Sequence, residues 1–286
     1  MYQTIDVETA SDLTFTADVA GPLGASVVLL LHGFPESRHS WRPALPALAA
    51  AGYRAVAPDQ RGYSSGARPD PVTLDNYAFD KLVNDAIEIA DAAGATGKRF
   101  HLVGHDWGGQ VSWGVAAKHP DRLASLTVLS RPHPKSFRRA LLKGDGDQQH
   151  RSRHHRAFLD PETGKMLLAD NARRLRDGLF GQGVPVEALE QHLSVLGNPA
   201  AIEAALAWYR ANVGLAADIG SIEVPTLYIW GDSDATVGPD AAHGTGEFVS
   251  AAFAMDILPG VGHFVMDQAA ARATELMLAH LDRHPV

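Results

Sequence analysis

The six residues from Gly104 to Gly109, GHDWGG, restrict the possible folds of this chain more than any other stretch. They follow an apolar, strand-like run at 100–103 and precede a run of helical character at 110–118. A buried strand, a tight glycine-flanked turn and a helix form a nucleophile elbow, which holds a reactive side chain above a parallel sheet. Asp106 occupies the position that carries serine in the pattern G-x-S-x-G. The stretch therefore predicts an α/β sheet whose candidate nucleophile is a carboxylate.

The rest of the chain supplies the strands and helices that such a sheet requires. Residues 2–9 and 13–20 alternate weakly and predict an opening antiparallel hairpin. A continuous apolar run, which is typical of a strand buried on both faces, follows at 27–31. Further strand-like runs that are mainly apolar follow at 53–57, 100–103, 123–129, 224–230 and 252–258. Helical spacing between or after these strands occurs at 41–51, 74–93, 110–118, 204–213 and 265–281. Strands that alternate with helices predict a mostly parallel sheet flanked by helices.

The segment 131–216 interrupts this alternation. It contains no buried-strand run, and it is rich in Arg, His and Leu at helical spacing. An insertion of this length between two strands of a compact domain is usually functional. We therefore expect an α/β core formed by residues 1–130 and 217–286, with residues 131–216 folded as a helical lid.

Composition excludes several classes of function. The net charge of −8 over 286 residues argues against a nucleic-acid or anionic-membrane surface. The absence of cysteine excludes disulfides, thiol catalysis and Cys-based metal sites. Residues 1–10 lack the pattern of a signal peptide, and no apolar run reaches the roughly 18 to 20 residues that span a bilayer. We expect a soluble, cytoplasmic protein that acts on a small molecule without a cofactor or metal. Whether it forms a homodimer is left open.

Asp106 has two interpretations at this strand–helix junction. Aspartate is a favoured helix cap, because its carboxylate accepts hydrogen bonds from the first helical N–H groups. The flanking glycines favour a catalytic role, because a simple cap does not require such close approach of strand and helix. A literal G-x-S-x-G also occurs at 62–66, but Pro69 and Pro71 follow it and forbid the helix that an elbow requires. Asp106 is therefore the predicted nucleophile.

A carboxylate nucleophile restricts the substrate. Attack on an acyl carbon would give an anhydride, which is no easier to form than the starting ester. Attack on an sp³ carbon gives an alkyl-enzyme ester that water can open, so strained epoxides and carbon–halogen bonds are suitable electrophiles. Hydrolysis at the carboxyl carbon of Asp106 requires an oxyanion hole. Its predicted donors are the backbone N–H groups of Phe34 and Trp107.

The water that opens the ester requires a base and an acid that orients the base. In this topology the acid precedes the histidine along the chain. His263 lies just after the last predicted strand, and Asp234 follows the strand that ends at Trp230. Asp232 is the alternative for the orienting acid, but an Asp that only forms the turn is common in such a loop, so Asp234 is favoured. Residues 130–132 contain no carboxylate, which removes the usual alternative position for the acid.

These segments resemble the α/β-hydrolase superfamily, and within it the epoxide hydrolases and their dehalogenase relatives. The resemblance covers the whole core, through HGFPES at 32–37, DQRGYSSGARP at 59–69, GHDWGG at 104–109, GDSD at 231–234 and GVGHF at 260–264. It implies an α/β-hydrolase fold with an inserted helical cap, a catalytic triad and a covalent intermediate. It also implies substrate contacts from His32, Pro35, Trp208 and Phe264.

In the predicted lid, the sequence matches only one of the two residues that the family pattern requires. In epoxide hydrolases two lid tyrosines typically hold and protonate the epoxide oxygen, and Tyr209 resembles one of them. The segment that normally carries the other has His154, and a histidine N–H can also donate to this oxygen. Fluoroacetate dehalogenases likewise pair a lid His with a lid Tyr, but they have arginines where this chain has Trp107 and Gln110. Haloalkane dehalogenases share the tryptophan and have HGNP, with Asn where this chain has Phe34.

The sequence therefore predicts an epoxide hydrolase that forms a vicinal diol, with His263 and Asp234 hydrolysing the ester on Asp106. The alternative is a haloalkane or haloacid dehalogenase with the same nucleophile and a halide site in the lid. A catalytically silent binding protein is disfavoured because every expected catalytic position is filled. Apart from His154, the basic cluster at 150–156 is interpreted as a solvated helix face, and its spacing matches no metal-ligand motif.

Overall fold

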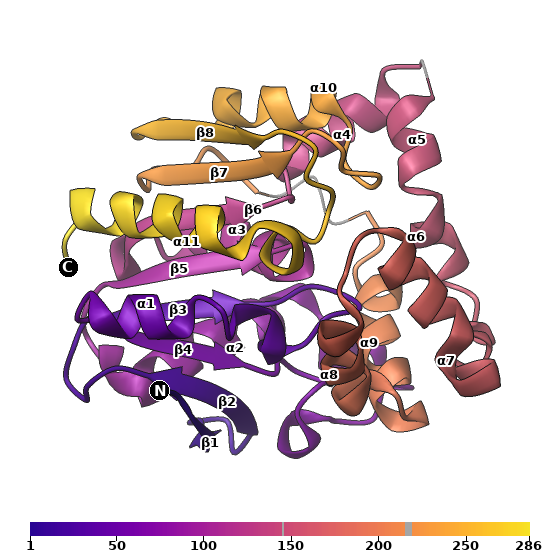
Figure 1. Cartoon of the computed structure of the whole chain (residues 1–286), viewed down its shortest axis with the longest axis horizontal. Coiled ribbons are helices and arrows are strands. Elements are labelled where there is room, and N and C mark those ends of the chain that lie inside the picture. The colour runs from indigo at the N-terminus through magenta and orange to yellow at the C-terminus, as the bar shows by residue number, and fades with distance from the viewer. Residues whose placement is uncertain (145, 215–218) are drawn as a thin grey trace.

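The computed structural model describes residues 1–144, 146–214 and 219–286. An eight-stranded sheet with the order β1-β2-β4-β3-β5-β6-β7-β8 forms its centre (Figure 1). The strands are β1 (Gln3–Glu8), β2 (Thr14–Ala20), β3 (Val27–Leu31), β4 (Arg54–Pro58), β5 (Phe100–His105), β6 (Leu123–Leu129), β7 (Thr226–Gly231) and β8 (Phe253–Leu258). β1 and β2 form the predicted antiparallel hairpin, β2 pairs antiparallel with β4, and β3 to β8 are parallel. The predicted α/β-hydrolase fold is confirmed.

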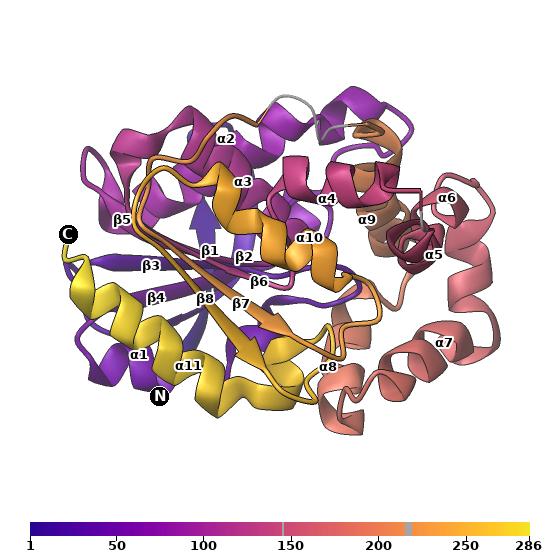
Figure 2. The ribbon, with the colours of Figure 1, turned by 90° about the horizontal axis from the view of Figure 1, so that it is seen from above.

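Helices cover both faces of the sheet, as Figure 2 shows. α1 (Leu45–Ala50) and α11 (Val265–Arg283) lie on one face, and α2 (Phe79–Ala90), α3 (Trp107–Lys118) and α10 (Pro239–His243) lie on the other. Strand β3 shows why two covered faces are required. Its five residues are all apolar and buried, and because alternate side chains point to opposite faces, they divide between two separate hydrophobic clusters.

The secondary-structure elements in the described part of the inserted segment are all helices, joined by turns, and most of the segment lies beyond the strand ends that carry the nucleophile turn (Figure 1). Its helices are α4 (Pro134–Leu142), α5 (Asp147–Arg151), α6 (Arg153–Ala157), α7 (Thr163–Gly181), α8 (Val186–Leu196) and α9 (Pro199–Ala211). The predicted boundary between lid and core, at 216/217, lies outside the described residues. Among the helices that the structure describes, none combines the length and the apolarity needed to cross a membrane.

The helix predicted at 74–93 is wrong as one continuous element. A 3₁₀ turn at Leu74–Tyr77 is followed by a break at Ala78, whose ψ is 143°, and only then by α2. The carbonyl of Tyr77 accepts a hydrogen bond from the Asn212 side chain at 2.9 Å, and the Tyr77 hydroxyl donates to the Pro69 carbonyl at 2.6 Å. These tertiary contacts compete with the helical hydrogen bonds that local spacing predicts. The helix predicted at 41–51 is likewise shorter, because α1 begins only at Leu45.

Candidate active site

Asp106 lies in a strained turn between β5 and α3. Its φ of 48° and ψ of −115° are unfavourable for a residue with a side chain, and such strain is usually found at functional sites. Two glycines allow the strand and helix to approach. A Cβ on Gly104 would lie 2.3 Å from the Gly108 carbonyl oxygen, and one on Gly108 would lie 2.2 Å from the Leu31 carbonyl oxygen. The Asp106 carboxylate makes no capping hydrogen bond to α3, so the turn does not use it as a helix cap.

His263 and Asp234 meet Asp106 at the same edge of the sheet. Nε2 of His263 lies 3.7 Å from Oδ2 of Asp106, and Nδ1 lies 2.9 Å from Oδ2 of Asp234. The other Asp234 oxygen accepts backbone N–H groups from Thr236 at 2.7 Å and Val237 at 3.0 Å. The competitor Asp232 is exposed and instead accepts the N–H of Gly260 at 2.7 Å. The structure therefore brings Asp234, and not Asp232, to His263.

The charges of these three residues depend on one another. Burial disfavours the imidazolium of His263, but the carboxylates of Asp234 and Asp106 outweigh it and raise the pKa to about 10. Burial would also raise the pKa of Asp106, yet its hydrogen bond and attraction to His263 hold that pKa well below the ordinary value. The pKa of Asp234 is lowered in the same way, against its burial, by the charge of His263. The resting site thus holds one imidazolium between two carboxylates.

Two side chains for which the sequence predicted no role, His105 and Ser130, hold the backbone of His263. Its carbonyl oxygen accepts hydrogen bonds from Nε2 of His105 at 2.8 Å and from Oγ of Ser130 at 2.9 Å. Nδ1 of His105 lies 2.5 Å from Oε2 of Glu36. Both nitrogens of this buried ring therefore face acceptors. Burial disfavours its charge, but the charge of Glu36 raises the pKa of His105, and His105 in turn lowers the pKa of Glu36 to about 2. His105 lies in GHDWGG and Glu36 lies in HGFPES. Their positions in these motifs were the sequence signal that could have identified them.

Phe34 and Trp107 are the two predicted oxyanion-hole residues, and a contact with the Asp106 carboxylate is observed for the first of them. The N–H of Phe34 donates to Oδ1 of Asp106 at 3.0 Å. This N–H therefore lies where it can reach charge that develops on the Asp106 carbonyl oxygen. Trp107 is the first residue of α3, where backbone N–H groups have no partner within the helix, and its role stays a prediction.

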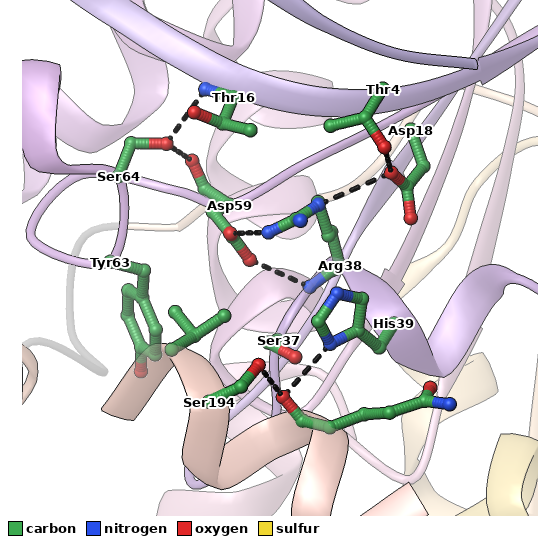
Figure 3. Close-up of polar contacts among 12 residues, drawn as sticks. Thr4, Thr16, Asp18, Ser37, Arg38, His39, Asp59, Tyr63, Ser64 and Ser194 are labelled. Carbon is green, nitrogen blue, oxygen red and sulfur yellow. Dashed lines mark hydrogen bonds and ion pairs between the residues drawn. The ribbon is translucent and has the colours of Figure 1, made fainter. Parts of the chain in front are cut away.

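The loop that carries Phe34 is anchored by Arg38, as Figure 3 shows. The backbone N–H of Arg38 donates to Asp59 at 2.9 Å, its Nη1 also pairs with Asp59, and its Nε donates to Asp18 at 3.3 Å. His39, next in the chain, contacts the inserted segment through the Gln191 carbonyl at 2.9 Å. This network fixes the loop to β2, to the end of β4 and to α8.

A cavity of about 440 Å³ lies between the sheet edge and the inserted helices. Asp106 and His263 line it from the core, and Tyr209 and His154 line it from α9 and α6. The rings of Tyr209 and Trp107 lie edge to face with centroids 5.1 Å apart, and since an indole N–H can only donate, it leaves the Tyr209 hydroxyl its own proton to donate. Burial, followed by the charge of Asp106, raises the pKa of Tyr209 well above 10. Tyr209 is thus a protonated donor in the same cavity as the nucleophile.

His154 is less suited to donate to a substrate oxygen. Its Nδ1 lies 3.1 Å from the carbonyl oxygen of Arg151, which can only accept, so Nδ1 carries the proton. In the neutral ring Nε2 is then an acceptor. Burial lowers the pKa of His154 to about 4, so the neutral form prevails near pH 7. It is His155, and not His154, whose ring contacts Tyr209, with centroids 5.6 Å apart.

The predicted substrate-contact residues divide into two groups. Pro35 and Phe264 line the cavity. His32 and Trp208 are not among its lining residues, because both are buried behind its wall. Nε2 of His32 accepts the N–H of Gln60 at 3.2 Å, and the indole of Trp208 donates to a backbone carbonyl at 2.9 Å. The last two residues therefore shape the wall rather than contact a ligand.

One group of potential metal ligands occurs among the described residues, and it does not include the triad. Glu36, His192 and Asp267 have ligand atoms within 4.8 Å of one another where α8 meets the core. Glu36 already accepts hydrogen bonds from His105 and Ser40, so only part of its coordination capacity is free.

Comparison with known proteins agrees with the fold. A family model described as alpha/beta hydrolase fold matches residues 26–270. Epoxide hydrolase A of Mycobacterium tuberculosis is 31% identical over 92% of each chain, and human epoxide hydrolase 4 is 32% identical over 89% of this chain and 72% of its own. A solved epoxide hydrolase from metagenomes of hot environments is 28% identical, covers 98% of both chains and has a TM-score of 0.83. The chain therefore belongs to the α/β-hydrolase superfamily and, within it, to the epoxide hydrolase family. It is a hydrolase.

Proposed function

We propose that this hydrolase opens epoxides to vicinal diols through an alkyl ester on Asp106. The observation that carries the proposal is a carboxylate in the strained turn, with His263 3.7 Å from one oxygen and the Phe34 N–H 3.0 Å from the other. A carboxylate in this place can attack a saturated carbon, and the opposing Tyr209 hydroxyl supplies a proton to the leaving oxygen. The helices α4 to α9 act as the lid that encloses the reacting groups.

In the first step, an oxygen of Asp106 attacks an epoxide carbon and the carbon–oxygen bond of the ring breaks. Tyr209 transfers its proton to the departing oxygen, which becomes the first hydroxyl of the diol. Formation of the ester removes the negative charge of Asp106. Because that charge helps to raise the pKa of His263 to about 10, the pKa of His263 falls once the ester forms, and the ring can release its proton and serve as a base.

In the second step, His263 takes a proton from water, and the resulting hydroxide attacks the carboxyl carbon of Asp106. Asp234 holds the Nδ1 proton of His263 and so keeps Nε2 unprotonated for this task. The N–H groups of Phe34 and Trp107 stabilise the oxyanion of the tetrahedral intermediate. Its collapse releases the second diol oxygen, which takes the proton held by His263. The carboxyl proton left on Asp106 then passes to His263, which restores the carboxylate and the imidazolium of the resting site. Tyr209 regains its proton from solvent.

The proposal is tested with two electrophiles and one variant. The purified protein is incubated with styrene oxide or with a haloalkane, and diol and free halide are measured. We expect phenylethanediol from the epoxide, no halide from the haloalkane, and no product from freshly purified Asp106→Asn whose mass excludes deamidation. Halide release without diol formation would instead support the dehalogenase, and undiminished activity of the variant would exclude the covalent route.

A further inference from the structure

A second cavity, of about 320 Å³, shares Tyr209 with the first. Trp107 and Gln110 line it from α3, and Arg131 lines it from the loop after β6. None of its described lining residues is a carboxylate. A substrate whose epoxide oxygen is bound by Tyr209 therefore has space beside that ring for a further substituent.

Arg131 lines this second cavity, where an amide and an aromatic ring hold its side chain. Its Nε donates to Oε1 of Gln110 at 2.9 Å, and its guanidinium carbon lies 4.5 Å from the centre of the Phe137 ring. No described carboxylate lies within ion-pairing distance, and the two terminal amino groups have no hydrogen-bond partner in the described part of the chain. Burial lowers the pKa of Arg131, and the more distant charge of Asp106 opposes this effect without outweighing it.

Another buried arginine of the same chain is paired. Arg61 binds Asp85 with two hydrogen bonds of 2.6 Å, through Nε and Nη2. This fork-to-carboxylate geometry is the arrangement that a guanidinium favours. In Arg131 the Nε donor is bound to Gln110, and the two terminal amino groups remain open to the cavity.

Apart from Asp106, the ionised side chains that line the two cavities are positive. Arg151, Arg153 and Arg174 line the first cavity, and Arg156 lines the second together with Arg131. Among the described residues that line the two cavities, Asp106 is the one carboxylate. In a chain with a net charge of −8, this concentration of arginines makes the enclosed space locally positive and attracts anions.

We propose that the substrate carries a carboxylate and that Arg131 holds it in the second cavity, so that the enzyme acts on epoxy acids. The inference rests on the proposed epoxide hydrolysis and specifies its substrate class. Gln110, which positions the guanidinium, follows Asp106 by one helical turn, or about 6 Å along the axis of α3. The carboxylate is therefore expected a few bonds away from the carbon that Asp106 attacks.

A matched pair of substrates tests this assignment: styrene oxide with a para-carboxylate, and the same epoxide with a para-carboxamide. The two have similar shape and differ in charge. We expect kcat/KM of the native enzyme to be higher for the carboxylate by about 10- to 100-fold. This ratio corresponds to the free energy of a hydrogen bond to a charged group. Arg131→Gln should remove most of this ratio, and Arg131→Lys should keep part of it. Arg138→Gln, which replaces an exposed arginine of α4, should leave the ratio unchanged.

Two results would overturn the inference. A native enzyme that hydrolyses both epoxides equally well refutes the carboxylate site and leaves the proposed epoxide hydrolysis intact. A carboxylate preference that survives in Arg131→Gln assigns the site to another residue. If neither epoxide is hydrolysed, the proposed function fails, and calorimetric binding of 4-ethylbenzoate still tests the site. Binding that Arg131→Gln abolishes supports the carboxylate site, and equal binding to both proteins, or to neither, refutes it.

Discussion

Asp234→Asn preserves the shape of a side chain while removing its charge, and the surrounding hydrogen bonds determine how the new amide must lie. Oδ1 of Asp234 accepts the N–H groups of Thr236 at 2.7 Å and Val237 at 3.0 Å. An asparagine keeps both bonds only if its NH₂ group replaces Oδ2, which lies 2.9 Å from Nδ1 of His263. Nδ1 must then accept a hydrogen bond, and the ring proton moves to Nε2. His263 loses the lone pair that takes a proton from water.

The size of the effect follows from two terms. A base held in the wrong tautomer loses its contribution to catalysis, about 10²- to 10⁴-fold in rate. The charge of Asp234 strengthens the same base, because a unit charge at about 3 Å and an effective dielectric constant of about 20 stabilises an imidazolium by about 5 to 6 kcal/mol. This term therefore overlaps with the first and does not multiply it. Its removal makes His263 a weaker base once Asp106 is esterified. We expect ester hydrolysis to slow by about 10³- to 10⁴-fold. Attack by Asp106 requires no base and should be largely spared.

The assay separates these two steps. With styrene oxide in excess, Asp234→Asn should form one equivalent of covalent ester in a burst, visible as a mass increase on the intact protein, and then almost stop. Asp232→Asn is the matched control, since Asp232 is exposed and bonds the N–H of Gly260 instead of His263. Steady turnover of Asp234→Asn near the native rate, or a block without accumulated ester, would refute the reasoning.

Three further predictions concern the proton donor, the buried charge pair and the pH dependence of stability. Tyr209→Phe removes the proton donor and should slow ester formation by about 10²- to 10⁴-fold, measured as the burst rate; an unchanged burst would contradict its role. Glu36→Gln leaves the His105 imidazolium without its counter-ion and should cost about 3 to 5 kcal/mol in urea unfolding. Exposed Glu8→Gln is the control, and native stability of Glu36→Gln would count against the buried pair. The pKa of His263 is raised from 6.5 to about 10, so the folded state binds more protons in this range. Its stabilisation is full below pH 6.5 and is lost as pH rises through 10, so the decline in unfolding free energy from pH 7 to 10 should be smaller in His263→Gln than in the native protein. Equal declines would contradict this.

The central residues could be predicted because local patterns mark the ends of parallel strands. Asp106, Asp234 and His263 follow β5, β7 and β8, and the carboxyl ends of parallel strands meet at one edge. Their convergence is a consequence of the topology. The fold was therefore accessible from apolar runs and glycine-flanked turns alone.

Other features depend on contacts that a sequence pattern does not contain. Arg131 approaches Gln110 across 21 positions of the chain, and neither residue lies in a motif that indicates this pairing. The position of His105 in GHDWGG marks it as a residue near the site, but it does not indicate that His105 holds the carbonyl oxygen of His263, because burial decides which nitrogens find partners. Trp208 lies in a segment that resembles the family pattern. Its place on α9 nevertheless directs the indole away from the cavity and toward the backbone carbonyl of Arg61.

The covalent ester on Asp106 is the central claim, and isotope labelling tests it most directly. The protein, in excess over styrene oxide, completes a single turnover in H₂¹⁸O, and the peptide that contains Asp106 is then analysed by mass spectrometry. Because water attacks the carboxyl carbon of the ester, the account predicts that ¹⁸O enters the Asp106 carboxylate and that the diol from this first turnover is unlabelled. Label in the diol, with none in the Asp106 peptide, would show direct attack of water on the epoxide and would contradict the account.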